Sequence, residues 1–304
     1  MIIHRQLKSL DIQGGTAVAL GYFDGVHIGH RRVLGAAALK ARQLGIKSAA
    51  FTFSLPKTGG FKGRRILASD EKHRRVGSLG IEHYIIPPFE SFCGLSPYEF
   101  VHDVLHGSFG AKEVFCGDNF TFGKDKAGNV AVLKQLCAAE GINVNIVSMA
   151  QYNGDTVSST RIRQALADGA IEDVNAMLGE DYCIRFEVRH GKGLGKTLGF
   201  PTINQIYPEG MQMPKSGVYI TEVTLDDGTK YAGATGLGTR PTVSAENEGT
   251  TCETFMPAFK GDIYGNFVTV RFCKYLKPTM KFATLEELTE YVNEAARYAL
   301  EYFK

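Results

Sequence analysis

The chain has 304 residues, 44% of them apolar, which is enough to fill the cores of two domains of about 150 residues each. Its 34 basic and 32 acidic residues are well mixed and leave a formal net charge of +2, which argues against nucleic acid or an anionic membrane as a partner. The first residues lack the apolar core of a signal peptide, and no window approaches about 18 consecutive apolar residues, so we expect a cytoplasmic protein.

The six cysteines are scattered through apolar neighbourhoods and form no Cys-x-x-Cys pair. In a chain of this size they are expected to be reduced, buried packing residues rather than a disulfide framework or a zinc site. Their positions are Cys93, Cys116, Cys137, Cys183, Cys252 and Cys273.

The most informative stretch runs from Gly21 to His30, between an apolar run suited to a strand (16–20) and a helical pattern (30–44) that Gly45 ends. Free N–H groups at a helix start favour anions, glycines let phosphates approach the backbone, and imidazoles can donate to a phosphoryl group that gains charge. Phosphoryl or nucleotidyl transfer is therefore indicated, although a metal pair or a polar first turn would look similar. The candidates are Gly21, Phe23, Asp24, Gly25, His27, Gly29 and His30.

Strand-like and helical runs alternate up to about Gly179, which predicts a parallel α/β sheet. Ser96 and Glu99 form a capping box with Pro97 at the first helical position, and a further helix is expected over 129–140. In open α/β sheets ligands bind at the carboxyl ends of strands, where the Gly21 loop would lie. The expected strands are residues 16–20, 46–53, 84–86, 113–116 and 144–147.

After Gly179 short strands and turn residues predominate, as in the hairpin predicted for 218–234. Thr284 and Glu287 open a final amphipathic helix, and a small closed β-barrel followed by this helix is expected. We place the domain boundary between residues 181 and 182. One strand face should present Val268, Val270, Phe272 and Leu276, and the helix should turn inward Leu285, Leu288, Val292, Ala295, Ala299 and Phe303.

The segment 157–163 places hydroxyl groups before two arginines at a helix start. Such hydroxyls cap helices, and arginine binds phosphate oxygens through two parallel hydrogen bonds, so the segment suits the phosphates of a nucleotide. An ordinary cap with solvated arginines is the alternative. The candidates are Ser158, Ser159, Thr160, Arg161 and Arg163.

The loop 117–123 follows a predicted strand and combines two glycines and two aromatic residues with an amide. It is either a turn with core phenylalanines or a pocket for a flat heterocycle, on which Phe122 would stack while Asn119 fixes its orientation.

The segment 190–204 contains the densest cluster of glycines. It does not match a P-loop, because the glycine spacing is too short and its flanks are β-like. Thr202 and Asn204 lie two apart on an extended segment, so their oxygens point the same way and could bind a hard cation such as Mg²⁺. A glycine hairpin with surface polar residues is the alternative. The nucleotide-binding candidates here are Gly191, Gly193, Gly195, Lys196, Gly199 and Pro201.

Six motifs in order along nearly the whole chain resemble the prokaryotic bifunctional riboflavin kinase/FAD synthetase (FMN adenylyltransferase) family. They are Gly-Tyr-Phe-Asp-Gly-Val-His-Ile-Gly-His, Gly-Asp-Asn-Phe-Thr-Phe-Gly, Ser-Ser-Thr-Arg-Ile-Arg, Leu-Gly-Phe-Pro-Thr-Ile-Asn, Gly-Thr-Arg-Pro-Thr and Asp-Ile-Tyr-Gly. The resemblance implies a Rossmann-like nucleotidyltransferase domain that makes FAD and pyrophosphate from FMN and ATP. It also implies a β-barrel kinase that makes FMN and ADP from riboflavin and ATP, with Mg²⁺ in both steps.

By resemblance, His27 and His30 stabilise the transition state at the α-phosphate, Arg161 holds the triphosphate with Ser159 and Thr160, and Glu253 takes the proton from riboflavin. The implied flavin-binding residues are Pro56, Asn119, Phe122 and Lys277. Of two loop prolines usual in the family only Pro56 remains, with Leu55 and Lys57 beside it. Lys196 stands in place of an arginine, Phe255 of a histidine and Lys277 of an arginine. A kinase with a silent or specialised first domain, or a non-enzymatic flavin- or nucleotide-binding regulator, is the alternative. Neither a protein partner nor an oligomeric state is indicated.

Overall fold

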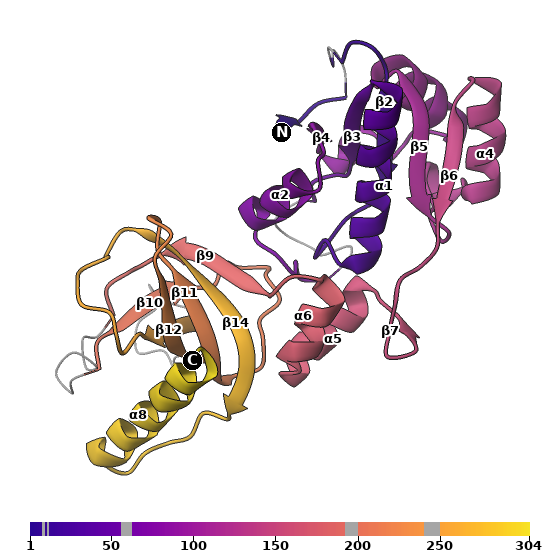
Figure 1. Ribbon diagram of the computed structural model, residues 1–304. Helices are drawn as coiled ribbons and strands as arrows, with labels where there is room; N and C mark the ends of the chain where they lie inside the picture. Colours follow the sequence, from indigo (N-terminus) through magenta and orange to yellow (C-terminus); the bar gives the residue numbers. More distant parts are fainter. Residues whose placement is uncertain (8–9, 11, 56–62, 192–199, 240–249) are drawn as a thin grey trace. The chain divides into compact units, whose positions relative to one another are not determined.

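The computed structural model describes residues 1–304 except 8–9, 11, 56–62, 192–199 and 240–249. The structure divides into two compact units. Figure 1 colours the chain along the sequence, from indigo at the N-terminus to yellow at the C-terminus. The first unit holds residues Met1–Gly63 and Lys72–Ser158, and the second holds Arg64–Glu71 and Ser159–Lys304. The boundary between residues 181 and 182 stays a prediction.

The first unit is built on a six-stranded sheet in which every neighbouring pair of strands is parallel. Its order is β1-β4-β3-β2-β5-β6, and the parallel sheet expected from the sequence is thereby confirmed. A short hairpin of β7 (Gln151–Tyr152) and β8 (Asp155–Thr156) follows. The strands of the sheet are β1 (Ile2–His4), β2 (Thr16–Leu20), β3 (Lys47–Phe51), β4 (His83–Ile85), β5 (Ala111–Gly117) and β6 (Asn143–Val147).

The helices of this unit begin and end at residues that stabilise helix termini. The His27 side chain accepts a hydrogen bond from the His30 N–H and caps α1, and Gly45 ends that helix in the left-handed conformation. The capping box of Ser96 and Glu99 is present and opens α3, which continues as a π-helical stretch, η2. The helices are α1 (Ile28–Leu44), α2 (Ser69–Ser78), η1 (Phe89–Ser91), α3 (Pro97–Glu99), η2 (Phe100–Ser108), η3 (Lys124–Lys126) and α4 (Val130–Ala139).

The order of the strands creates a switch point at β2. The chain runs from β2 to β3 and on to β4 on one side, then returns to place β5 and β6 on the other side. α1 packs against β2, β3 and β5, as Figure 1 shows. Because parallel neighbours end at the same edge, the loops after β2 and β5 share that edge, where ligands bind in open α/β sheets.

The second unit holds a six-stranded sheet in the order β10-β13-β12-β11-β14-β9, with antiparallel neighbours. A bridge between Arg189 and Asn204 joins its two ends, and the Gln205 amide donates to the carbonyl of Phe186 at 2.8 Å, so the sheet forms a nearly closed barrel as expected. Its elements are α5 (Ser159–Asp168), α6 (Ile171–Leu178), β9 (Cys183–Glu187), β10 (Thr202–Ile206), β11 (Gly217–Thr224), β12 (Lys230–Thr239), β13 (Thr250–Phe255), β14 (Phe267–Lys277) and α8 (Leu285–Tyr302).

The final helix, α8, covers one face of this barrel (Figure 1). Thr284 caps it by accepting from the Glu287 N–H, while the Glu287 carboxylate accepts from the Ala283 N–H. Ala295 packs with Val218 and Ala234, so the helix completes the hydrophobic packing of β11 and β12.

Three of the expected inward residues lie elsewhere. Leu276 packs with Cys273 against α8 instead of sharing the face of Val268. The pairing of β11 with β14 shifts register once between Phe272 and Lys274, which reverses the alternation before Leu276 is reached. Leu285 and Phe303 are 50% and 39% exposed, since they lie at the two ends of α8, beyond the packed turns.

Five of the six cysteines are buried, as expected, whereas Cys93 is exposed. Burial raises the pKa of the Cys137 thiol to about 12, which keeps this thiol protonated and unreactive at neutral pH. Among the described residues, no helix is both long enough and apolar enough to cross a membrane.

Gly233 in β12 offers a test of the packing inside the barrel. A Cβ there would lie 2.8 Å from Thr221 Oγ1 and 3.0 Å from Thr254 Cγ2, whereas one at Gly238 in the same strand would meet nothing within 4 Å. We expect Gly233→Ala to lower the unfolding free energy by about 1–3 kcal/mol, because overpacked cores must shift. Gly238→Ala is the matched control, and equal thermal denaturation midpoints for the two variants would contradict this packing.

Candidate active site

Two histidines meet at the start of α1, directly after β2. Their rings stack with centroids 3.6 Å apart, and Phe23 contacts the His30 ring edge-on at 5.4 Å. His27 is 5% exposed, and its Nδ1 accepts the His30 N–H at 3.3 Å. The remaining ring nitrogen, Nε2, therefore carries the proton whenever the imidazole is neutral, and it is a donor. A donor at a helix N-terminus suits an anionic ligand.

The loop that carries these histidines has a constrained backbone. Phe23 and Val26 adopt φ values of 54° and 46°, which are uncommon for non-glycine residues and especially so for a β-branched one. A Cβ on Gly21 would lie 2.7 Å from the Phe23 ring, and one on Gly29 would lie 3.2 Å from the His27 ring. Gly21 therefore has no room for a Cβ and Gly29 packs tightly against the His27 ring, while Gly25, at φ 84°, has a backbone conformation that favours glycine.

Burial determines the charge of His27. It lowers the pKa of the imidazole from 6.5 to about 4, with a backbone hydrogen bond opposing part of the effect. The side chain is therefore neutral at pH 7 and donates to a ligand without carrying a charge of its own. Asp24 is also buried, at 4% exposure.

The loop after β5 lies at the same edge of the sheet. Asn119 is exposed there, whereas Phe122 is 7% exposed and belongs to the hydrophobic core, where it packs on Phe100 with ring centroids 5.4 Å apart. Phe122 therefore has the role of a core phenylalanine, which was the alternative given for this loop. Whether it also binds flavin stays a prediction. Pro56 lies outside the described residues.

Aromatic side chains continue this edge beyond β3. Phe53 contacts Tyr22 at 4.9 Å and Phe89 at 5.0 Å between ring centroids. The sequence reasoning did not single out this row, because its members come from three separate segments. Flat apolar faces near an anion site suit a ligand with both a ring and a phosphate.

The arginine segment opens the longer of the two stretches that form the second unit. Ser159, Thr160, Arg161 and Arg163 lie in the first turns of α5, and Ser158 is the last residue of the first unit. Arg163 Nε donates to the carbonyl of Arg64 at 2.7 Å. One donor of this guanidinium therefore holds the backbone before α2, and the phosphate contacts of the segment stay a prediction.

A second cluster forms in the barrel, where β10 pairs with β13. Asn204 lies directly opposite Glu253, and Thr202 lies two residues from Asn204 on the same strand. Directly opposed residues of an antiparallel pair share a face, so a hydroxyl, an amide and a carboxylate lie together although their positions are up to 51 residues apart. Asn204 is 7% exposed and Glu253 is half-buried.

The surroundings of this cluster bear on the other predicted residues. A Cβ on Gly191 would lie 2.5 Å from the Asn204 amide nitrogen, so only glycine lets this backbone pass so close. Pro201 is exposed beside Thr202. The predicted residues Gly193, Gly195, Lys196 and Gly199 lie outside the described residues.

Two departures from the family pattern have a local explanation. Phe255 is 9% exposed and packs with Phe200 and Ala296 of α8, so an apolar ring fits where the family has histidine. Lys277 forms an ion pair with Glu294 of α8 and lies 3.6 Å from the centroid of the Tyr291 ring. This pairing lowers the pKa of the Glu294 carboxyl.

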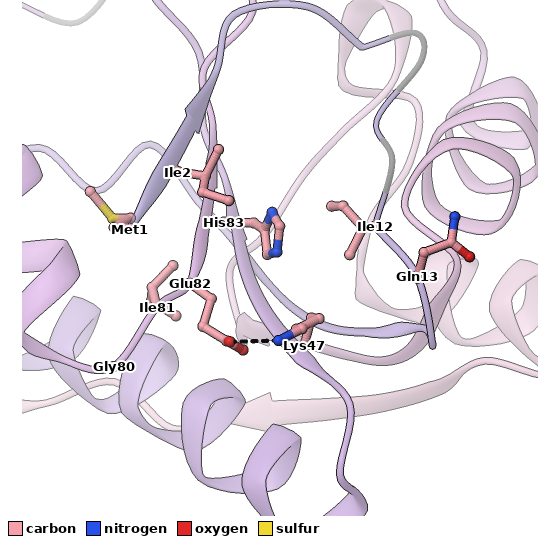
Figure 2. A pocket seen from close by; sticks show the side chains of 9 residues that line it. All are labelled: Met1, Ile2, Ile12, Gln13, Lys47, Gly80, Ile81, Glu82 and His83. Atoms are coloured by element: carbon pink, nitrogen blue, oxygen red, sulfur yellow. Dashed lines mark hydrogen bonds and ion pairs between the residues drawn. The ribbon is translucent and has the colours of Figure 1, made fainter.

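Two cavities do not coincide with the predicted residues. The first, of about 540 Å³, is lined by residues at the starts of β1, β3 and β4, including His83 and the ion pair of Lys47 with Glu82 (Figure 2). It lies at the strand ends opposite to the histidine loop. The second, of about 550 Å³, is lined by residues 187–190 with Tyr264 and Gly265, next to the bridge between Arg189 and Asn204.

Sequence reasoning also missed two contacts to the histidine loop. Thr52 Oγ1 donates to the Tyr22 carbonyl at 2.8 Å, and Lys72 Nζ donates to the same carbonyl at 2.7 Å. Neither residue stands in a motif, and only the folding of β3 and α2 toward the loop shows them. Among the described residues, no group of three or more His, Cys, Asp or Glu side chains could hold a metal ion.

Comparison with known proteins assigns both halves of the chain. Residues 9–161 match the FAD synthetase family and residues 178–303 match the riboflavin kinase family. The chain belongs to the bifunctional riboflavin kinase/FMN adenylyltransferase family. It is therefore an enzyme of flavin cofactor synthesis with a kinase part and a nucleotidyltransferase part, and the resemblance drawn from the six motifs is confirmed.

Members of this family match over nearly the full length of both chains. The Bacillus subtilis protein is 30% identical over 96% of this chain and 93% of its own, and the Pseudomonas fluorescens protein is 31% identical over 92% and 90%. A crystal structure of a Streptococcus pneumoniae protein described as a macrolide-efflux protein is 28% identical, covers 97% of this chain and 98% of its own, and superposes with a TM-score of 0.84. That description differs from both family matches, so this structure supports the fold alone.

The low pKa of His27 makes stability depend on pH. Between about pH 6.5 and pH 4 the histidine is protonated in the unfolded chain but stays neutral in the folded chain. Its contribution to the free energy of unfolding is therefore complete above pH 6.5 and falls as pH is lowered, by up to about 3 kcal/mol. His27→Asn keeps an acceptor for the His30 N–H but does not titrate, and should remove that part of the pH dependence. In histidine NMR titrations, one resonance should titrate near pH 4 and disappear in the variant; a resonance lost from near pH 6.5 would contradict the burial.

Proposed function

We propose that adenylyl transfer takes place at the His27 and His30 loop and that riboflavin phosphorylation takes place at the Thr202, Asn204 and Glu253 cluster. The observation that carries this assignment is that each family match spans one cluster. Residues 9–161 contain the histidine loop and Arg161, and residues 178–303 contain the barrel cluster. The division at residues 181 and 182 is part of this proposal.

In adenylyl transfer a phosphate oxygen of FMN attacks the α-phosphate of ATP, and pyrophosphate leaves. Charge develops on the α-phosphoryl oxygens, where the Nε2–H of His27, the His30 side chain and the N–H groups at the start of α1 would donate. Ser159, Thr160 and Arg161 would hold the β- and γ-phosphates. The attacking group is already anionic, so this step needs neither a general base nor a covalent enzyme intermediate.

In the kinase step the terminal ribityl hydroxyl attacks the γ-phosphate of ATP, and ADP leaves. The Glu253 carboxylate would take the hydroxyl proton. Because Asn204 lies opposite Glu253 in the register, the proton acceptor would lie beside the phosphate-binding side of the site. Gly191 leaves room for the Asn204 amide, and the role of residues 191–199 in covering ATP stays a prediction.

The donor set of the barrel cluster fits Mg²⁺. Thr202 and Asn204 offer a hydroxyl and an amide oxygen on one face of a strand, and hard cations prefer such ligands. When bound, the ion would neutralise charge on the phosphates of ATP. The Mg²⁺ requirement, the cytoplasmic location, and the flavin contacts of Asn119, Phe122 and Lys277 stay predictions.

Glu253→Gln tests the kinase assignment. The amide keeps the shape of the side chain but cannot accept the proton, so FMN formation from riboflavin should fall about 10²- to 10⁴-fold, while FAD formation from supplied FMN stays unchanged. Chromatography of the flavin products measures both steps. Glu290→Gln, an exposed carboxylate on α8, is the control. Equal loss of the two activities would refute the division of labour.

His30→Ala tests the nucleotidyltransferase assignment. With one phosphate donor removed, FAD formation should fall about 10²- to 10³-fold while riboflavin is still converted to FMN, which accumulates. The exposed His102, changed to Ala, is the matched control in the same unit. FAD produced at the normal rate by the His30 variant would move the site away from this loop.

A further inference from the structure

We propose that Lys72 is a positioning residue for adenylyl transfer, because it fixes the peptide group on which the conformation of the histidine loop depends. This inference rests on the proposed role of the loop. Lys72 lies on α2, 50 residues from Tyr22 in the sequence, and belongs to none of the six motifs.

The contact has two components. Lys72 Nζ donates to the Tyr22 carbonyl at 2.7 Å and lies 4.9 Å from the centroid of the Tyr22 ring. Phe53 also contacts that ring, with centroids 4.9 Å apart. An ammonium group hydrogen-bonded to a carbonyl and placed near an aromatic face makes a stronger contact than a neutral donor would.

A second donor converges on the same oxygen. Thr52 Oγ1 donates to the Tyr22 carbonyl at 2.8 Å, and Thr52 itself is fully buried at the end of β3. The carbonyl is thus held from the sheet by Thr52 and from α2 by Lys72. With one donor the carbonyl could still turn about that contact, whereas two donors determine its direction.

This carbonyl belongs to the peptide group that joins Tyr22 to Phe23, where the unusual backbone begins. Phe23 has φ 54°, and Val26 has φ 46°. Backbone strain of this kind persists only where surrounding contacts over-determine it. Fixing the peptide before Phe23 therefore helps to hold the course of the chain through Asp24 to His27.

The same contact changes the donor strength of the loop. A carbonyl that accepts from an ammonium group polarises its peptide, so the N–H of Phe23 becomes a better donor. Phe23 is one of the residues predicted to bind nucleotide. Lys72 would thus act on the phosphates through this peptide rather than by touching them, and we call it a positioning residue and not a catalytic one.

The test compares Lys72→Met, Lys72→Gln and Lys72→Arg in the full chain, measuring kcat and KM for FAD formation from FMN and ATP, with riboflavin kinase activity of the same samples as an internal reference. We expect kcat for FAD formation to fall about 10- to 100-fold in the Met and Gln variants, the KM for ATP to change less than about threefold, and Arg to restore most of the rate. Kinase activity should be unchanged. Arg74→Met, an exposed cation on the same helix, should behave as wild type.

Several outcomes would overturn the inference. One is a normal rate of FAD formation in the Met or Gln variant, and another is an equal fall in both activities together with a lower denaturation midpoint. A third is the same loss in Arg74→Met, which would show that the overall charge of α2 matters and not the contact of Lys72. Should the Met variant not fold, the Gln variant decides by the same criteria. His30→Ala measured in parallel separates the two proposals: if it retains FAD formation the loop assignment has failed, and if it alone loses FAD formation only the role of Lys72 has failed.

Discussion

The pairing of β2 with β5 is the contact on which the first candidate site depends. Parallel strands need crossover connections, and a sheet that grows first to one side and then to the other must leave two neighbouring strands whose following loops diverge. Here those loops contain His27 and Asn119. All five residues of β2 are buried, because this strand has a neighbour on each side within the sheet.

The two proposed sites would solve the same problem, the binding of ATP phosphates, by different physical means. At the start of α1 the donors are a neutral, buried imidazole and the free N–H groups of a helix terminus, which cost little desolvation because they carry no full charge. In the barrel, the paired strands offer oxygen atoms: those of Thr202 and Asn204 suit a cation, and those of Glu253 can accept a proton. At both sites a glycine lies against a functional side chain: Gly29 packs tightly against the His27 ring, and a Cβ on Gly191 would overlap the Asn204 amide.

What the sequence placed wrongly, left open or did not indicate has a common origin. Leu276 was assigned to the wrong face because alternation along a strand holds only while the register holds, and the bulged pairing of β11 with β14 breaks it. Phe122 could be a pocket residue or a core residue by its motif, and its burial against Phe100 depends on η2, a neighbour from another part of the chain. Lys72 carried no signal at all, since a single lysine on a polar helix looks like any solvated one.

By itself, the sequence determined the local features of this protein: the strands and helices, the caps at Ser96, Asn129 and Thr284, the change from α/β to β architecture, and the ordered motifs of its family. Each of these follows from the periodicity or hydrogen bonding of residues close together in the chain. The tertiary structure alone decided the register that sets Asn204 opposite Glu253, the burial that keeps His27 neutral, and the two donors on the Tyr22 carbonyl. These features depend on contacts between residues that are 30 or more positions apart in the sequence. A local sequence pattern does not specify which distant residues come into contact.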